Sequence, residues 1–217
     1  MQREPIGMVQ PRGTWTRVGK AEIPHRPPGP SLPTCQDEFF LLSIGKQPIL
    51  HQVKRRATFD SSFWVHAVYL DLVDFLLDDY TLVCPRAVER ELGGENPAAE
   101  RLRALRAQGQ IQRAKARVEK IKLYGLGERA AINLALEQSL LLLIDDWRPY
   151  EAAAALGVET VNIVAYLVHL FARDRISADR VFGALAKLVK RRTLRSEWTS
   201  AGLKLVAEIR RQRTEKG

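Results

Sequence analysis

Short apolar runs alternate with amphipathic stretches from about residue 57 to the C-terminus. The apolar runs predict five strands, at residues 57–59, 80–84, 110–114, 140–144 and 158–161. The stretches between and after them predict helices, at residues 63–77, 85–92, 97–108, 128–137, 149–156, 162–173, 178–192 and 198–212. Strands that alternate with helices favour parallel pairing through right-handed crossovers. The sequence therefore predicts an α/β fold, a three-layer sandwich around a central parallel sheet, followed by C-terminal helices.

The first 56 residues differ in composition from the rest of the chain. Seven of the eleven prolines lie before residue 37, and Pro-Pro-Gly-Pro at 27–30 excludes a helix or a central strand there. We expect a proline-rich extension over residues 1–56, partly disordered, a domain over 57–176, and basic helices over 177–217 that pack on it. No apolar run approaches the roughly 20 residues of a membrane span, and the N-terminus has no apolar signal segment. We therefore expect a cytoplasmic protein without a membrane partner.

Charge is segregated along the chain, which carries a net charge of +9 over 217 residues. The net charge is +5 over residues 1–56, −6 over 57–96, +6 over 97–122, −4 over 123–172 and +8 over 173–217. Carboxylates gathered within a basic protein fit a metal-dependent enzyme that acts on a phosphodiester. Solvated helix surfaces give the same pattern, so charge alone leaves both interpretations open.

Five acidic residues follow the predicted strands directly or lie on the adjoining helices: Asp60, Glu91, Glu128, Asp145 and Asp146. In an open parallel sheet, ligands bind beyond the carboxyl ends of the strands, so we expect these side chains at one rim. Carboxylates so close together repel one another unless cations lie between them. Oxygen ligands alone fit Mg²⁺ or Mn²⁺ rather than zinc. The histidines and the two cysteines have no metal-ligand spacing.

Each of these acids also has a purely structural explanation. Asp60 and the pair at 145–146 can cap the helices that follow them. Glu91, with Glu89 beside it, can be a solvated surface acid, and Glu128 can stabilise the first turn of a helix. Because all of them fall at rim positions together, a shared site explains the set better than separate structural roles.

Four short motifs fall in a fixed order along the predicted domain. They are Phe-Asp-Ser-Ser at 59–62, Val-Cys-Pro-Arg-Ala-Val-Glu-Arg-Glu-Leu at 83–92, Gly-Leu-Gly-Glu-Arg-Ala-Ala-Ile at 125–132 and Leu-Leu-Ile-Asp-Asp at 142–146. Their order and spacing resemble those of the PIN-domain family, close to the VapC-like toxin ribonucleases and their uncharacterised relatives. The resemblance covers about residues 57–176.

This resemblance implies a PIN-like fold and a Mg²⁺- or Mn²⁺-dependent endoribonuclease that leaves a 3′-hydroxyl and a 5′-phosphate. The family's catalytic, metal-binding acids fall on Asp60, Glu91, Glu128 and Asp146. Asp145 is implied as a further metal ligand. The side chains implied to support these acids are Ser61, Ser62 and Asn162.

The basic segments are expected to contact the RNA backbone and to make binding depend on salt. The residues concerned are Arg101, Arg103, Arg106, Arg113 and Lys115, together with the cluster at 187–195. The expected partners are an RNA substrate, a second copy of the chain in a homodimer and, if the protein is toxin-like, a cognate antitoxin bound near the site.

One departure from the family pattern keeps a second class of function open. Val161-Asn162 stands where the similar subgroup often has Gly-Thr before the next helix. The alternative hypothesis is a catalytically silent RNA- or protein-binding module that has kept the fold. A DNA nuclease that uses the same acids is a third.

Overall fold

A five-stranded parallel sheet forms the centre of the computed structural model, which describes residues 54–117 and 119–216. The strand order is β3-β2-β1-β4-β5. The strands are β1 (Arg55–Phe59), β2 (Tyr80–Pro85), β3 (Ile111–Ala114), β4 (Leu141–Leu143) and β5 (Thr160–Val161). Each strand overlaps one of the five predicted runs, although β1 begins two residues earlier than predicted and β5 covers only the last two residues of its run. Every pairing is parallel. The predicted α/β fold is thus confirmed.

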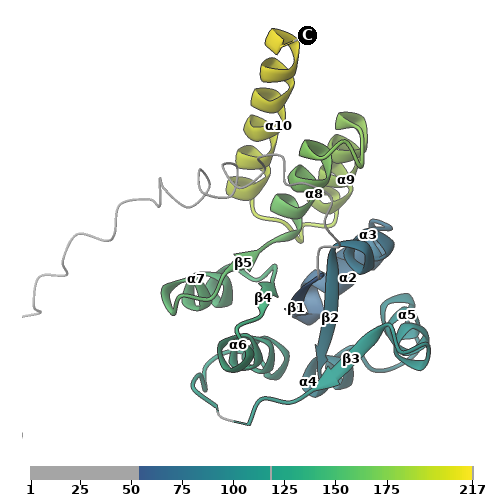
Figure 1. Cartoon of the computed structure of the whole chain (residues 1–217), viewed down its shortest axis with the longest axis vertical. Coiled ribbons are helices and arrows are strands. Elements are labelled where there is room, and N and C mark those ends of the chain that lie inside the picture. The colour runs from purple at the N-terminus through teal and green to yellow at the C-terminus, as the bar shows by residue number, and fades with distance from the viewer. Residues whose placement is uncertain (1–53, 118, 217) are drawn as a thin grey trace, which may run out of the picture. The chain divides into compact units, whose positions relative to one another are not determined.

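Helices cover both faces of this sheet. They are α2 (Ser61–Tyr69), α3 (Val73–Asp79), α4 (Arg86–Glu91), α5 (Pro97–Ala107), α6 (Leu126–Gln138), α7 (Trp147–Ala155), α8 (Ile163–Ala172), α9 (Ala178–Lys190) and α10 (Ser196–Lys216). Figure 1 shows α4, α6 and α7 on one side of the sheet and α2, α3, α5 and α8 on the other. Two helical layers therefore enclose the sheet, as the predicted three-layer sandwich requires.

The central strands are buried on both faces, which explains why they read as unbroken apolar runs. Leu141, Leu142 and Leu143 of β4 are at most 1% exposed. Phe59 at the end of β1 stacks on Trp64 of α2, with ring centroids 4.9 Å apart. The core thus fixes the end of β1 against the first helix, at the point where the first rim acid follows.

The single helix predicted over residues 63–77 is wrong, because the structure has two helices there. α2 ends at Tyr69 and α3 begins at Val73. Between them Asp71 takes the left-handed backbone conformation, with φ 56°, and its carbonyl accepts a hydrogen bond from Arg180 at 3.1 Å. Leu72 is buried, so the apolar period continues across the break. No glycine or proline marks the turn, and the sequence pattern therefore hides it.

The two last helices pack against α8. A Cβ added at Gly202 of α10 would overlap Cγ1 of Val164 on α8, so the two helices approach more closely there than a larger residue allows. None of the described helices combines the length and the apolar character that crossing a membrane requires.

The predicted extension over residues 1–56 lies outside the described residues, except for its last three positions. Cys35 lies outside them as well. Cys84, near the end of β2, is fully buried. The boundaries proposed at residues 57 and 176 stay predictions.

Candidate metal centre and groove

The carboxyl ends of β1, β4 and β5 meet at one edge of the sheet. Phe59 pairs with Leu143, and Leu143 pairs with Val161. The backbone N–H of Asp60 extends the ladder by donating to the carbonyl of Leu143 at 3.0 Å. Because the strands are parallel, the polar residues that follow each of them arrive at this same edge.

Asp60 combines a structural contact with an unpaired oxygen. Its Oδ1 accepts a hydrogen bond from the backbone N–H of Phe63 at 2.8 Å and so caps α2. Its Oδ2 is buried and has no hydrogen-bond partner among the described residues. Burial, and then the charges of Asp145, Glu128 and Asp146, raise the pKa of Asp60 well above its usual value. A carboxylate in this position requires a proton or a cation.

Asp145 holds two neighbouring elements in place. Its Oδ2 lies 2.7 Å from Nδ1 of His66, and its Oδ1 accepts a hydrogen bond from the backbone N–H of Ile163 at 2.7 Å. Asn162, just before α8, caps that helix by accepting from the N–H of Ala165 at 2.9 Å. Asp145 and Asn162 thus have structural roles at the rim, and the participation of either in chemistry stays a prediction.

Glu91 reaches the rim because Gly127 has no side chain. A Cβ added at Gly127 would overlap the carboxylate of Glu91 and would lie 3.5 Å from the hydroxyl of Ser61. Glu91 ends α4, Gly127 lies in the first turn of α6, and Ser61 begins α2. Three helices therefore bring their ends together around one glycine, where only that residue admits the approach.

Glu89, the neighbouring acid on α4, is bound elsewhere. It forms ion pairs with Arg106 of α5 and with Nε of Arg113 of β3, the latter at 3.0 Å. These two arginines balance its charge, whereas the carboxylate of Glu91 faces Gly127 and Ser61. The geometry favours Glu91 as the rim acid.

Glu128 and Asp146 complete the acidic cluster. The Glu128 side chain folds back over Gly125 at the start of α6, and its Oε2 is buried without a hydrogen-bond partner among the described residues. Burial, with smaller contributions from the charges of Glu91 and Asp146, raises the pKa of Glu128. Asp146 precedes α7, is exposed, and makes no capping hydrogen bond to that helix.

Each of the four predicted acids lies close enough to another of them for one charge to act on the other. Asp60 is affected by the charges of Glu128 and Asp146, and Glu128 by those of Glu91 and Asp146. Such repulsion falls off with distance, so the four side chains occupy one region of the fold.

A groove of about 1040 Å³ opens over this region. Its acidic side contains Ser61, Ser62, Glu91, Asp145 and Asp146. Basic and aromatic residues line the groove as well, and together they are called its basic side: Tyr69, Trp147, Arg148, Arg191, Thr193 and Arg195. A negatively charged polymer can thus lie along arginines while one of its phosphates reaches the acids, provided that a cation neutralises them.

A family model, DUF3368, which describes a PIN domain, matches residues 59–206 of this chain. The chain belongs to the PIN-domain family. Among solved structures, it is similar to a PilT N-terminus domain protein from the hyperthermophilic archaeon Sulfolobus solfataricus P2, with 19% identity and a TM-score of 0.36. That similarity covers 49% of this chain and 86% of the other. A search of curated proteins found no match.

The match extends beyond the sheet to residue 206, so it includes α9 and about the first half of α10. Membership gives the chain a nuclease-type fold, of the kind that typically uses a divalent metal. The resemblance drawn from the four motifs is thereby confirmed.

The residues of this PIN domain fit a hard divalent cation by their chemistry. Three buried carboxylate oxygens have no hydrogen-bond partner within the described ranges: Oδ2 of Asp60, Oε2 of Glu128 and Oε2 of Glu89. That of Glu89 lies 3.0 Å from Nε of Arg113, so the two rim oxygens are the ones left for a cation. In those ranges no group of three or more Asp, Glu, His or Cys side chains is placed so that it could hold a metal ion. Mg²⁺ commonly binds through one or two carboxylates and keeps several waters, so a partial set of acids fits it.

The five basic residues expected to contact RNA lie on α5, on β3 and just after β3: Arg101, Arg103, Arg106, Arg113 and Lys115. Most of them already have partners. Arg101 lies 2.6 Å from Asp74, Arg103 donates to the carbonyl of Gly94 at 3.1 Å, and Glu89 binds the next two arginines. Their contact with RNA stays a prediction.

Sequence reasoning did not identify the groove's aromatic side chains or the role of Gly127. From the sequence, Tyr69 is one residue of a predicted amphipathic helix, and Trp147 lies two residues before another. Gly127 lies in a Gly-Leu-Gly motif that predicts only a loop before a helix. The role of Gly127 follows from the close approach of the Glu91 carboxylate, and that contact between two distant parts of the sequence exists only in the folded chain.

Proposed function

We propose that this PIN domain is a metal-dependent endoribonuclease that hydrolyses RNA phosphodiesters. The observation that carries the proposal is the placement of the acids. Glu91 and Asp146 line a groove that also contains arginines, while the buried Oδ2 of Asp60 and Oε2 of Glu128 have no hydrogen-bond partner among the described residues. An unpaired acidic cluster raises the energy of the folded state and persists where a bound cation offsets it. The nuclease-type fold of the family supports the same assignment.

The four acids would hold one or two Mg²⁺ or Mn²⁺ ions. Such ions supply an activated water nucleophile and neutralise the charge that develops on the phosphate. Asp60 would offer its unpaired Oδ2 from below, while the exposed Asp146 and Glu91 would reach the ion from the groove. Ser61 and Ser62, which also line the groove, would donate hydrogen bonds to a phosphate oxygen.

The test compares RNA cleavage by the wild type with that of two α7 variants. Asp146→Asn removes a groove acid that is exposed and caps nothing, so folding should persist. Glu151→Gln removes an exposed acid from the same helix and is the matched control. We expect Mn²⁺-dependent cleavage of single-stranded RNA that Asp146→Asn reduces by at least about 100-fold, because loss of a metal ligand costs several kcal/mol of transition-state stabilisation.

Cleavage that persists in chelator, or in Asp146→Asn, contradicts the mechanism. Binding of RNA without any cleavage favours the silent-module alternative instead. One feature supports that alternative: Asn162 uses its side-chain oxygen to cap α8 and offers no hydroxyl at that position.

The homodimer and the antitoxin are also part of the proposal. Light scattering of the purified chain tests the first. For the second, a co-purified small protein that blocks cleavage would be the expected finding.

A further inference from the structure

Two of the three arginines that line the groove come from a segment outside the predicted domain of residues 57–176. The connection between α9 and α10 contributes Arg191, Thr193 and Arg195, and the start of α7 contributes Arg148. All four side chains are exposed. They line the same cavity as Glu91 and Asp146, so one bound polymer can touch both sides at once.

Aromatic rings hold two of these arginines in place. The guanidinium of Arg191 lies 4.2 Å from the ring centroid of Tyr69, and that of Arg195 lies 4.8 Å from that of Trp147. A guanidinium fixed over a ring keeps its charge and its hydrogen-bond donors and loses less conformational entropy when it binds a phosphate. The aromatic rings beside them also offer surfaces on which unpaired bases stack.

These charges are less neutralised than those on α5 and β3. Within the part of the chain that the structure describes, neither Arg148 nor Arg191 forms an ion pair with a carboxylate, and Arg195 has one exposed contact, at 3.8 Å from Glu197. By contrast, Arg101, Arg106 and Arg113 pair with acids at the start of α3 or on α4.

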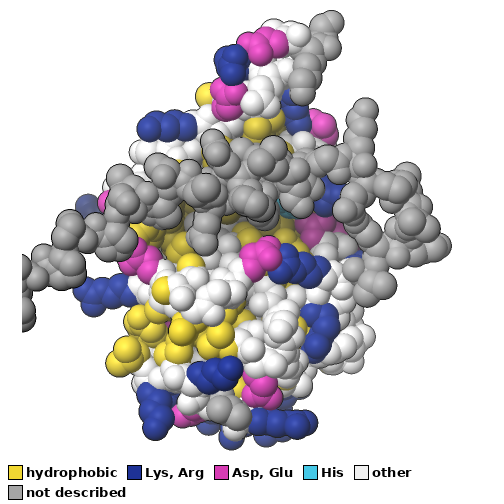
Figure 2. All heavy atoms as spheres, turned by 60° about the vertical axis from the view of Figure 1, so that its left-hand side comes forward, with side chains coloured by type: hydrophobic (Ala, Val, Ile, Leu, Met, Phe, Trp, Pro, Cys, Tyr) yellow, Lys and Arg dark blue, Asp and Glu magenta, His cyan; other side chains and the backbone are white. Residues whose placement is uncertain are grey.

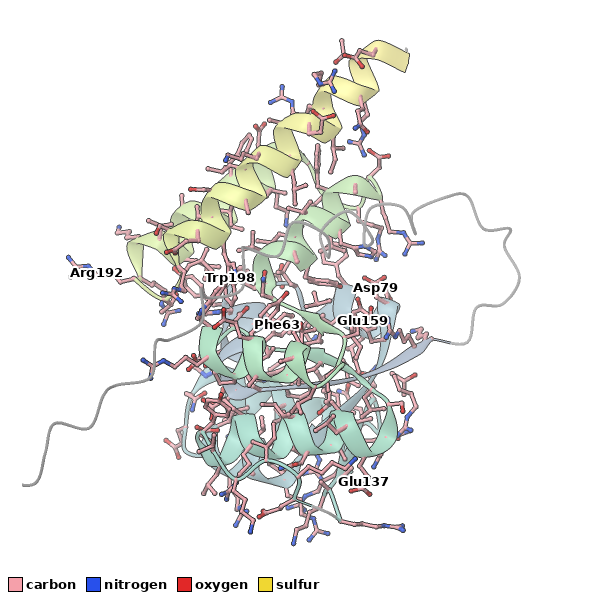
Figure 3. The ribbon with its side chains drawn as sticks, turned by 90° about the vertical axis from the view of Figure 1, so that its left-hand side faces the viewer. Phe63, Asp79, Glu137, Glu159, Arg192 and Trp198 are labelled. Carbon is pink, nitrogen blue, oxygen red and sulfur yellow. The ribbon has the colours of Figure 1, made fainter. Side chains whose placement is uncertain are left out.

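Figure 3 shows how this segment projects. Arg192 points outward from the connection, while Trp198 at the start of α10 lies toward α7. Trp198 packs on Trp147 and Tyr150, with ring centroids 5.5 Å apart in each pair. The aromatic cluster thus fixes the connection beside α7. On the face drawn in Figure 2 the basic side chains are scattered rather than gathered in one stripe.

We propose that the α9–α10 connection is the phosphate-binding wall of the groove, and that Arg191 and Arg195 contact the backbone of single-stranded RNA on its way to the acids. This inference rests on the proposed function for the identity of the polymer. It assigns binding to the C-terminal helices of this chain instead of to α5 and β3.

The test measures RNA binding in the absence of cleavage. Every variant carries Asp60→Asn and is titrated in chelator against a fluorescein-labelled 12-nucleotide polyuridine, with fluorescence anisotropy as the readout. Arg191→Gln/Arg195→Gln removes the wall. Arg101→Gln/Arg103→Gln removes the same charge from α5 and is the matched control. Arg191→Lys/Arg195→Lys restores the wall's charge.

Two lost phosphate contacts should lower the slope of log affinity against log salt by about 1.4, which is about a 25-fold loss of affinity at 0.1 M salt. We expect that loss for the glutamine wall variant, less than about threefold for the α5 control, and recovery of the salt slope in the lysine variant. Thermal unfolding curves establish that each variant is folded.

Equal losses for the wall and the α5 control overturn the proposal, as does a wall variant that binds normally or a parent that binds no RNA. Cleavage by the wild type is measured separately with Mn²⁺. If RNA binding depends on the wall while the wild type does not cleave, the proposed function fails and the wall assignment stands.

Discussion

Asp60 has two roles with opposite effects on stability. Its Oδ1 caps α2, which stabilises the fold, while its buried Oδ2 lies among the charges of Asp145, Glu128 and Asp146. Asparagine keeps the capping oxygen and removes the charge. We therefore expect Asp60→Asn to abolish cleavage and to raise the melting temperature in chelator by roughly 2–4 °C, the shift that about 1 kcal/mol produces in a domain of this size.

The same substitution gives a pH dependence of definite sign. Because the pKa of Asp60 is raised in the folded state, the folded chain binds its proton more tightly than the unfolded chain does. Stability is therefore lost as pH rises from the unfolded value, near about 4, through the raised folded value. The stability advantage of Asp60→Asn over the wild type in chelator should grow between pH 5 and pH 8, as measured by urea unfolding.

Asp74→Asn is the control for both measurements, since Asp74 is an exposed acid paired with Arg101. Its stability should follow that of the wild type at each pH. A gap between Asp60→Asn and the wild type that shrinks as pH rises would sink the idea that buried charge at Asp60 destabilises the fold.

Cys84 should be inert in the folded protein. It is fully buried at the end of β2, and burial raises the pKa of its thiol to about 12 despite the nearby charges of Arg106 and Arg113. The thiolate is the reactive form, so little of it exists at pH 8. In a Cys35→Ser variant, the remaining thiol should react with a disulfide reagent only after denaturant is added. Rapid labelling without denaturant contradicts this.

At the scale of helices, alanine substitutions at two glycines are expected to differ in their effects: one should reduce cleavage and the other should only raise stability. A Cβ at Gly127 would displace the carboxylate of Glu91, the flexible end of a long side chain, so Gly127→Ala should cost little stability. It should lower Mn²⁺-dependent cleavage by at least about tenfold, because a catalytic carboxylate misplaced by about 1 Å is enough for such a loss. The measurement is the cleavage rate together with the melting temperature.

Gly183 of α9 provides the control, because a Cβ there meets nothing within 4 Å. Gly183→Ala should leave cleavage unchanged and stabilise the protein by about 0.5–1 kcal/mol, the usual advantage of alanine over glycine inside a helix. If both alanine variants keep full activity, the contact between Gly127 and Glu91 has no role in catalysis.

The strands and most helices could be predicted because burial on both faces leaves a plain apolar signature, as at Leu141–Leu143. The turn at Asp71 could not, since a left-handed backbone at an aspartate leaves no glycine or proline signal. The choice between Glu89 and Glu91 rested on family likeness. The physical basis of that choice lies in tertiary contacts, because two arginines bind Glu89 while Gly127 leaves room for the carboxylate of Glu91.

At the scale of the molecule, the groove joins parts of the chain that are far apart in sequence. Its acidic side comes from the ends of β4 and α4 and the start of α2. Its basic side comes mainly from the connection that precedes α10, together with the start of α7. The position of that connection depends on how α10 docks. α10 packs on α8 through the close approach of Gly202 to Val164, while Trp198 packs on Trp147.

This arrangement predicts that a change in helix docking weakens RNA binding from a distance. In Gly202→Ala the new Cβ overlaps Val164, whose branched side chain is stiff, so α10 must shift. We expect a loss of about 1–3 kcal/mol of stability, the usual cost of overpacking, and weaker binding of polyuridine in the Asp60→Asn background. Gly183→Ala, which adds the same methyl group in open space, should bind RNA normally. If Gly202→Ala loses stability but keeps its RNA affinity, the contact with Trp147 is enough to position Arg195, and the position of the α9–α10 connection does not depend on how α10 docks.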